Sequence, residues 1–250
     1  MKIALVTGGS RGLGKSMALH IAAKGNDVVL TYNRKKADAE DVVKQIEQTG
    51  RKAAALALDL SDSKSFDGFV EKLKEVLPVK WKRDDFDFLV NNAGIGIYSP
   101  FAETSEKQFD ELMKTHLKGP FFLTQRLLPL IKDGGRVVNI STGLARFTLP
   151  GYAAYAAMKG GIEVLTRYMA KELGARRITV NVLAPGAIET DFAGGVVRDN
   201  KEVNKFLASQ TALGRVGLPD DIGGAVASLL ADDNLWITGQ RIEASGGTFL

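Results

Sequence analysis

Short apolar runs alternate along the chain with longer segments in which apolar residues recur at helical spacing. Most runs are continuously apolar over four or five residues and lack the two-residue alternation of a sheet with one solvent-facing side. Strands of a parallel sheet have this composition, because helices cover both of its faces. We therefore expect a doubly wound α/β fold with a seven-stranded parallel sheet. The expected strands lie at residues 2–8, 27–32, 52–60, 87–94, 135–141, 178–186 and 240–247.

The segment after residue 104 predicts a long, interrupted helix. The pattern SEKQ at 105–108 is a capping box, and the helical pattern continues to about Ile131. Pro120 lies within it and has no N–H to donate to the carbonyl of His116, four residues earlier. We expect a kink there and a free carbonyl at His116. No Pro-, Gly- or Ser-rich linker and no repeat divides the chain, so residues 1–250 are expected to form one domain.

Composition argues against several classes of site and partner. The chain contains no cysteine and only two histidines, far apart, so we expect neither a disulfide nor a metal site. The net charge is +4, but the basic residues are scattered and the densest basic segment, 79–85, also holds two aspartates, so we expect no nucleic-acid partner. No stretch approaches the ~18 apolar residues of a membrane span, and the N-terminal apolar run is too short for a signal peptide. We expect a cytoplasmic protein without a membrane partner.

A glycine-rich loop follows the first expected strand. Gly8, Gly12 and Gly14 have the spacing G-x-x-x-G-x-G and precede a predicted helix. Glycines permit a tight turn and close approach of the backbone to a ligand, and a helix N-terminus presents free N–H groups to a pyrophosphate. An ordinary glycine turn is the alternative. The preceding buried strand and the following helix favour dinucleotide binding.

The second expected strand suggests which dinucleotide binds. An acidic residue at the end of this strand commonly binds the free 2′-hydroxyl of NAD. Here Tyr32 occupies that position, Arg34 follows, and Arg11 lies within the glycine loop. Two guanidinium groups suit a 2′-phosphate, so we expect NADP(H) to be favoured over NAD(H). For Lys35 and Lys36, a solvated loop is an equally good interpretation.

The sequence GYAAYAAMKGG, residues 151–161, contains two tyrosines and a lysine. On a helix, Tyr152, Tyr155 and Lys159 would share one face, since they stand at i, i+3 and i+7. They could form a partly buried aromatic stripe with a lysine that reaches solvent. Alternatively, one tyrosine is an acid whose pKa is lowered by the nearby ammonium group.

Four motifs in order resemble the short-chain dehydrogenase/reductase family. They are TGGSRGLG (7–14), NNAG (91–94), YAAMK (155–159) and PG (185–186), and the likeness runs from Met1 to about Thr248. Segments 214–222 and 237–240 are most similar to 3-oxoacyl-carrier-protein reductases and related ketone reductases. The resemblance implies a Rossmann-like fold and an NAD(P)-dependent oxidoreductase acting on carbonyl or alcohol groups.

The resemblance also implies the catalytic residues. Tyr155 would donate the proton, and Lys159, four residues on, would lower its pKa and bind the nicotinamide ribose. The family usually has a serine 13 positions before the tyrosine; here that position is Thr142, and Ser141 has the opposite strand parity. Threonine also offers a hydroxyl, so we assign the role to Thr142. His116 replaces an asparagine whose main-chain carbonyl holds a relay water; its ring either fills the helix kink or carries protons itself.

The remaining site residues are carried over from the same family. Residues 188–209 lose clear periodicity, and in the family this segment covers the substrate. The substrate pocket is expected to contain Ile95, Tyr98, Leu144, Phe147, Tyr152 and Phe192. The implied cofactor-binding residues are Gly8, Ser10, Arg11, Gly12, Leu13, Gly14, Tyr32, Asn33, Arg34, Asp59, Leu60, Asn91, Ala93, Gly94, Tyr155, Lys159, Pro185, Gly186, Ile188 and Thr190.

Three functions follow from this resemblance. The first is NADPH-dependent reduction of a small-molecule ketone, or alcohol oxidation in reverse. The second is reduction of a 3-oxoacyl group on a carrier protein; Asp133 stands where such reductases carry a basic residue, which favours free carbonyls, although Lys171 remains basic. The third, from another class, is a non-catalytic NADP-binding sensor, which the intact tyrosine–lysine pair disfavours. The family resemblance also implies a homotetramer.

Overall fold

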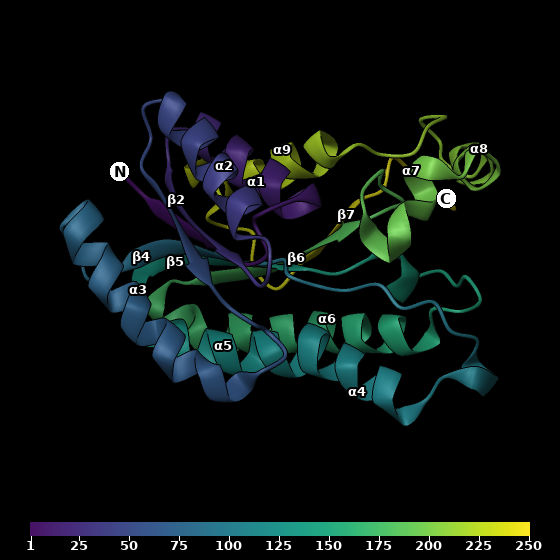
Figure 1. Cartoon of the computed structure of the whole chain (residues 1–250), viewed down its shortest axis with the longest axis horizontal. Coiled ribbons are helices and arrows are strands. Elements are labelled where there is room, and N and C mark those ends of the chain that lie inside the picture. The colour runs from purple at the N-terminus through teal and green to yellow at the C-terminus, as the bar shows by residue number, and fades with distance from the viewer.

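A computed structural model describes residues 1–250 and contains one sheet whose paired strands all run parallel. The strand order is β3-β2-β1-β4-β5-β6-β7 (Figure 1). All seven predicted runs overlap a strand, although β5 begins four residues earlier than predicted, so the predicted doubly wound, Rossmann-like sheet is confirmed. The order reverses between β1 and β4, and ligands of open α/β sheets bind beside such a reversal. The strands are β1 (Ile3–Val6), β2 (Asp27–Tyr32), β3 (Ala53–Ala57), β4 (Phe86–Asn91), β5 (Ile131–Ile140), β6 (Thr179–Pro185) and β7 (Arg241–Ala244).

Helices cover both faces of the sheet, which explains the continuously apolar strands. In β1, Ala4 and Val6 pack into one hydrophobic cluster, whereas Ile3 and Leu5 pack into the other. The first cluster lies under α1 (Gly12–Ala23), α2 (Lys36–Gln48) and α9 (Pro219–Leu229). The second lies under α3 (Phe66–Trp81), α5 (Gly119–Leu127) and α6 (Ala153–Leu173). Figure 1 shows these two helical layers on opposite sides of the strands.

The helix predicted from 105 to about Ile131 is shorter and divided. Helix α4 (Glu106–Met113) begins at the predicted capping box, in which Gln108 donates its backbone N–H to the Ser105 side chain. Residues 114–118 form a π-helical turn before α5. The interruption expected near Pro120 is therefore a local widening of the helix. The predicted end was wrong, because residues 128–130 form a 3₁₀ turn around a second proline and Ile131 already belongs to β5.

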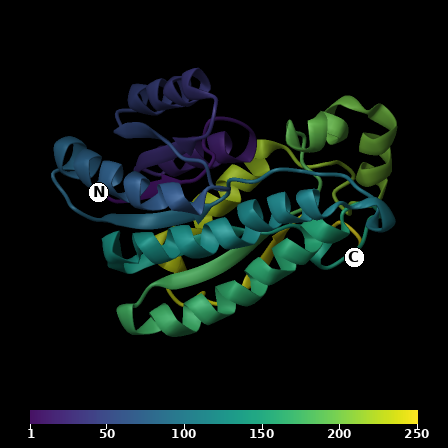
Figure 2. The same ribbon diagram turned by 60° about the horizontal axis from the view of Figure 1, so that its bottom comes forward.

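The segment after β6 lies at one end of the sheet. It contains α7 (Val196–Asp199) and α8 (Lys201–Ser209), which Figures 1 and 2 place beside the C-terminus. None of the helices combines the length and the apolar character needed to cross a bilayer. No group of three or more His, Cys, Asp or Glu residues gathers where a metal could bind.

Candidate active site

The glycine-rich loop connects β1 to α1 and leaves no room for side chains at its centre. Gly8 and Gly12 have positive φ angles of 68° and 53°, a region that favours glycine. A Cβ on Gly14 would lie 2.1 Å from the carbonyl oxygen of Gly8. Helix α1 has no side-chain cap and no acidic residue in its first turn, so its first N–H groups are available to an anion. This cradle fits the pyrophosphate of a dinucleotide.

Two residues that sequence reasoning missed hold this loop against β4. The Thr7 hydroxyl accepts hydrogen bonds from the backbone N–H groups of Asn92 and Ala93, at 2.9 and 3.0 Å. The Asn92 side chain donates to the carbonyl of Thr7 at 2.9 Å and to that of Gly8 at 3.3 Å. The NNAG motif could have identified Asn92, because when two amides follow a buried strand, one of them is expected to face the neighbouring loop.

The side chain of Asn91 has the opposite orientation. Its amide donates to the Thr124 hydroxyl at 3.0 Å and to the Asn139 side-chain oxygen at 2.8 Å. Both donors are therefore used inside the protein, and the residue is only 6% exposed. The structure does not bring this side chain to the glycine cradle. Its contribution is to hold β4 against β5 and α5.

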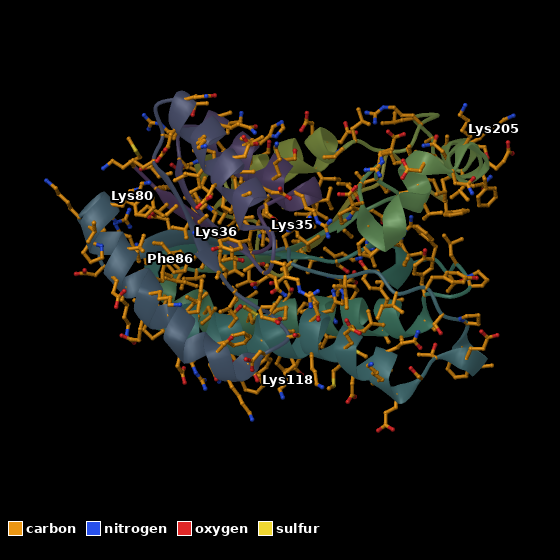
Figure 3. All side chains as sticks on the ribbon, in the orientation of Figure 1. Lys35, Lys36, Lys80, Phe86, Lys118 and Lys205 are labelled. Atoms are coloured by element: carbon orange, nitrogen blue, oxygen red, sulfur yellow. The ribbon has the colours of Figure 1, made fainter.

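A polar cluster lies beyond the ends of β2 and β3. The pKa of Asp59 is below its ordinary value, mainly because Ser61 donates hydrogen bonds to it, with smaller contributions from Asn33 and Arg34. Arg34 is exposed and makes no ion pair. Lys35 and Lys36 also lie on the surface near the start of α2 (Figure 3), and Lys36 pairs with Glu40 at 3.6 Å, as expected of a solvated segment. Arg34 is thus the cation available to a ligand at this end.

The loop after β6 approaches the glycine loop from the other side. A Cβ on Gly12 would lie 3.8 Å from the Cβ of Thr190. Arg11 forms an ion pair with Asp191 at 3.7 Å. A Cβ on Gly186 would lie 2.8 Å from the Cα of Ser245. The predicted loop residues from both halves of the sheet therefore meet. Leu60 was also predicted to bind the cofactor, but it is buried in the hydrophobic core, so its side chain does not face a ligand.

Tyr155, Lys159 and Thr142 meet where α6 passes the end of β5. Tyr155 and Lys159 are 6% and 5% exposed, and the Lys159 ammonium lies 5.8 Å from the centre of the Tyr155 ring. The same ammonium donates a hydrogen bond of 2.7 Å to the carbonyl of Ile140. Tyr152 occupies the N-cap position of α6 and packs against the small cluster that contains Tyr155.

Burial determines the ionisation of this pair. It raises the pKa of Tyr155 above its ordinary value, and the nearby Thr142 hydroxyl offsets only part of the increase. Burial also lowers the pKa of Lys159 to about 7. The expected lowering of the tyrosine pKa by the lysine is therefore wrong for this structure, because removing the phenolate from water raises the pKa and only Thr142 opposes this. Tyr155 consequently holds its proton at neutral pH.

Ser141 and Thr142 point in different directions, as their strand parity predicts. The Thr142 hydroxyl is near Tyr155 and accepts a hydrogen bond of 3.3 Å from the backbone N–H of Leu144. The Ser141 hydroxyl donates to Glu163 at 2.7 Å. The structure thus places Thr142 beside the tyrosine and Ser141 against α6.

His116 lies under the tyrosine from the π-helical turn. Its ring is 1% exposed and meets the Tyr155 ring edge-on, with centroids 5.0 Å apart. Its Nε2 is 2.8 Å from the carbonyl oxygen of Ile95, whereas the buried Nδ1 has no partner. Burial, with a contribution from Lys159, places the pKa of His116 well below its ordinary value. A Cβ on Gly94 would lie 2.6 Å from the ring, so the glycine makes room for this neutral imidazole.

A cavity of about 330 Å³ opens next to these residues. Three of its lining residues were predicted, namely Tyr98, Leu144 and Tyr152, and the two tyrosine rings meet edge-on with centroids 5.6 Å apart. Phe192 lies 5.5 Å from the Tyr155 ring. Phe147 packs on Phe249 instead of lining the cavity, because the chain turns at Gly143. The lining residues missed from the sequence are Pro100, Phe101, Thr148, Leu149, Pro150, Gly151, Ala153 and Ala156.

Ile95 and the open hollow near the C-terminus lie outside this cavity. Ile95 packs in a small cluster with Tyr155 and Met158. The hollow has a volume of about 440 Å³ and is lined by residues 209–212, Gly247, Phe249 and Leu250. None of its lining residues belongs to the tyrosine–lysine site.

Comparison with known proteins agrees with this geometry. Residues 8–248 match a family model described as Enoyl-(Acyl carrier protein) reductase. The hydroxynaphthalene reductase-like protein Arp2 of Metarhizium brunneum is 36% identical over 99% of this chain and 94% of its own length. The angucycline C-6 ketoreductase LanV with bound NADP superposes with a TM-score of 0.94 at 37% identity, covering 99% of this chain and 95% of LanV. LanV with NADP and rabelomycin gives a TM-score of 0.90 at 35% identity, covering 99% and 96%.

Three kinds of observation agree on the family to which this chain belongs. The glycine cradle, the buried tyrosine–lysine pair and the sheet order arise from the chain's own residues. The family model spans nearly the whole chain, and the relatives match over their full fold. The chain belongs to the short-chain dehydrogenase/reductase family and is an NAD(P)-dependent oxidoreductase that acts on carbonyl or alcohol groups.

Proposed function

We propose that this chain reduces an apolar, aromatic ketone with NADPH, and that Tyr155 donates the proton. The observation that supports this most strongly is the meeting of Tyr155, Thr142 and Lys159 beside an aromatic-walled cavity. A bound nicotinamide would supply the hydride to the carbonyl carbon. The chain's own residues must hold the carbonyl oxygen, deliver its proton and exclude water.

Each step has a residue suited to it. The Thr142 hydroxyl, a neighbour of Tyr155, holds the carbonyl oxygen. Tyr155 keeps its proton at neutral pH because burial raises its pKa, so it is available as a donor. As the phenolate develops, the protonated form of Lys159, with a pKa of about 7, stabilises it and can return a proton.

The segment 188–209 is proposed to cover the substrate. Phe192 already approaches the Tyr155 ring, and a Cβ on Gly96 would lie 2.9 Å from the Phe192 ring. Tyr98 and Tyr152 contribute aromatic faces to the neighbouring cavity, most of whose lining residues are apolar. A fused-ring aromatic ketone suits such walls, and a relative of this chain is named for hydroxynaphthalene reduction.

The substrate is tested by measuring NADPH consumption with a panel of free and carrier-bound ketones. We expect turnover with fused-ring aromatic ketones and a weaker response to a 3-oxoacyl-carrier protein. Tight NADPH binding with no turnover on any carbonyl would support the sensor alternative and contradict the proposed function.

The cofactor preference is tested with the same assay. We expect a KM at least about tenfold lower for NADPH than for NADH, since a hydrogen bond to a charged group contributes about 1.5–3 kcal/mol. Arg34→Ala should reduce the ratio of the KM for NADH to the KM for NADPH. The control Lys36→Ala should leave that ratio unchanged, because Lys36 pairs with Glu40. A lower KM for NADH in the unmodified protein would show the assignment to be wrong.

His116 is proposed to act through its main-chain carbonyl, with its ring as a structural filler. His116→Asn is therefore expected to retain most of kcat, because the buried ring is already neutral and the substitution keeps the main-chain carbonyl. The pH dependence of kcat checks this. If the substitution changes the shape of that profile strongly, the imidazole itself carries protons.

We also propose that the chain forms a homotetramer, as the family resemblance implies. Large apolar side chains are exposed on α4, α5 and α6, where no part of this chain covers them. They are Phe109, Phe121, Phe122, Val164 and Tyr168. Further copies of the chain would bury these surfaces.

A further inference from the structure

A partly buried ion pair lies behind Thr142. The carboxylate of Glu163, on α6, and the guanidinium of Arg241, on β7, meet at 2.7 Å. Their side chains are only 14% and 23% exposed. Neither residue contacts Tyr155 or lines the cavity. The catalytic steps described above make no use of either residue.

This pair holds the chain on both sides of the Thr142 hydroxyl. Glu163 accepts a hydrogen bond of 2.7 Å from the Ser141 hydroxyl. Arg241 donates to the main-chain carbonyl of Thr142 at 3.2 Å. Lys159 holds the preceding carbonyl, that of Ile140, at 2.7 Å. Residues 140–142, at the end of β5, are therefore each fixed by a different charged side chain.

The geometry of the guanidinium explains why an arginine suits this place. Its Nε donates to Glu163, one terminal nitrogen donates to Glu243 at 3.0 Å, and the other reaches Thr142. Burial alone would lower the pKa of Arg241, but the hydrogen bonds that it donates to both carboxylates raise the pKa above its ordinary value. A lysine carries the charge but lacks the planar fork that can satisfy all three acceptors.

We propose that Glu163 and Arg241 are positioning residues that hold the Thr142 hydroxyl at the distance from Tyr155 required for catalysis. The backbone here is also held by hydrogen bonds from Ser141 to Leu183 and from Ala145 to Thr142, but the ion pair adds side-chain anchors at Ser141 and Thr142. Small displacements of reacting groups reduce rates steeply. The inference rests on the proposed role of Thr142. Under this proposal, kcat depends on a salt bridge that touches neither substrate nor cofactor.

The test compares Arg241→Ala with the control Arg146→Ala. Arg146 belongs to the same network, since it binds Glu243 at 2.8 Å and the carbonyl of Thr248 at 2.8 Å, but it does not touch residues 140–142. We expect Arg241→Ala to lower kcat about tenfold or more through misplacement of Thr142. The dissociation constant for NADPH should stay unchanged, and Arg146→Ala should keep the original kcat.

Two further variants keep the test informative if Arg241→Ala folds poorly. Arg241→Lys and Glu163→Gln preserve side-chain volume, and both should lower kcat while thermal unfolding stays close to that of the original protein. Full kcat in Arg241→Lys, or equal losses in Arg241→Ala and Arg146→Ala, would overturn the proposal. An active Thr142→Ala variant would instead show that the proposed function of Thr142 is wrong, so the two failures are distinguishable.

Discussion

Replacing Tyr155 by Phe is expected to lower kcat by about 10³-fold, within the range that a positioned general acid contributes. Phenylalanine keeps the ring that packs edge-on against His116 and against Phe192, so the fold and the cavity wall should persist. Only the hydroxyl and its proton are lost. Steady-state measurement of NADPH consumption gives kcat, and thermal unfolding confirms that the variant is folded.

Tyr152→Phe is the matched control for this prediction. Tyr152 is a second tyrosine three residues away, but it lies at the start of α6 and its ring packs on Tyr98. Its pKa is raised by burial and by the neighbouring tyrosine, and no lysine lies near it. We expect a far smaller effect, confined mainly to KM. If Tyr152→Phe abolishes turnover and Tyr155→Phe does not, the proton donor has been misassigned.

The arrangement of strands was predictable because it follows from local composition. Every residue of β1 is fully or almost fully buried, with alternate side chains facing the two helical layers, so the run reads as continuously apolar. The glycine loop was predictable for a similar reason: a side chain at Gly14 would collide with the backbone of its own loop. These constraints act over a few residues and leave a clear pattern.

The features that could not be predicted from the sequence depend on contacts between distant segments. Whether Asn91 or Asn92 faces the glycine loop is decided by the register of β4 against β5, and the sequence does not specify that register. The pKa of Tyr155 was expected to fall because Lys159 is four residues away. It rises because burial, which requires the whole fold, dominates. Arg241 reaches Thr142 from 99 residues along the chain, and no spacing rule identifies such a pair.

Thr142 provides the second large effect. Thr142→Ala is expected to lower kcat by about 10²–10³-fold, the loss typical of removing one donor that stabilises a developing oxyanion. The substitution deletes the hydroxyl that lies near Tyr155, while the backbone at 142 remains held by Arg241. Binding of NADPH should be unaffected, because the glycine loop and Arg34 lie elsewhere. The measurement is kcat and KM with a ketone identified from the panel.

Thr142→Ser separates the hydroxyl from the methyl group. Serine retains the donor, so most of kcat should return, although the loss of χ1 restriction and of one methyl leaves the pocket slightly wider. Ser141→Ala should have a smaller effect than Thr142→Ala, since the Ser141 hydroxyl only anchors the chain to Glu163. A full loss in Ser141→Ala together with an active Thr142→Ala would reverse the assignment. The strand parity after β5 would then differ from the one in which Thr142 faces the tyrosine and Ser141 faces α6.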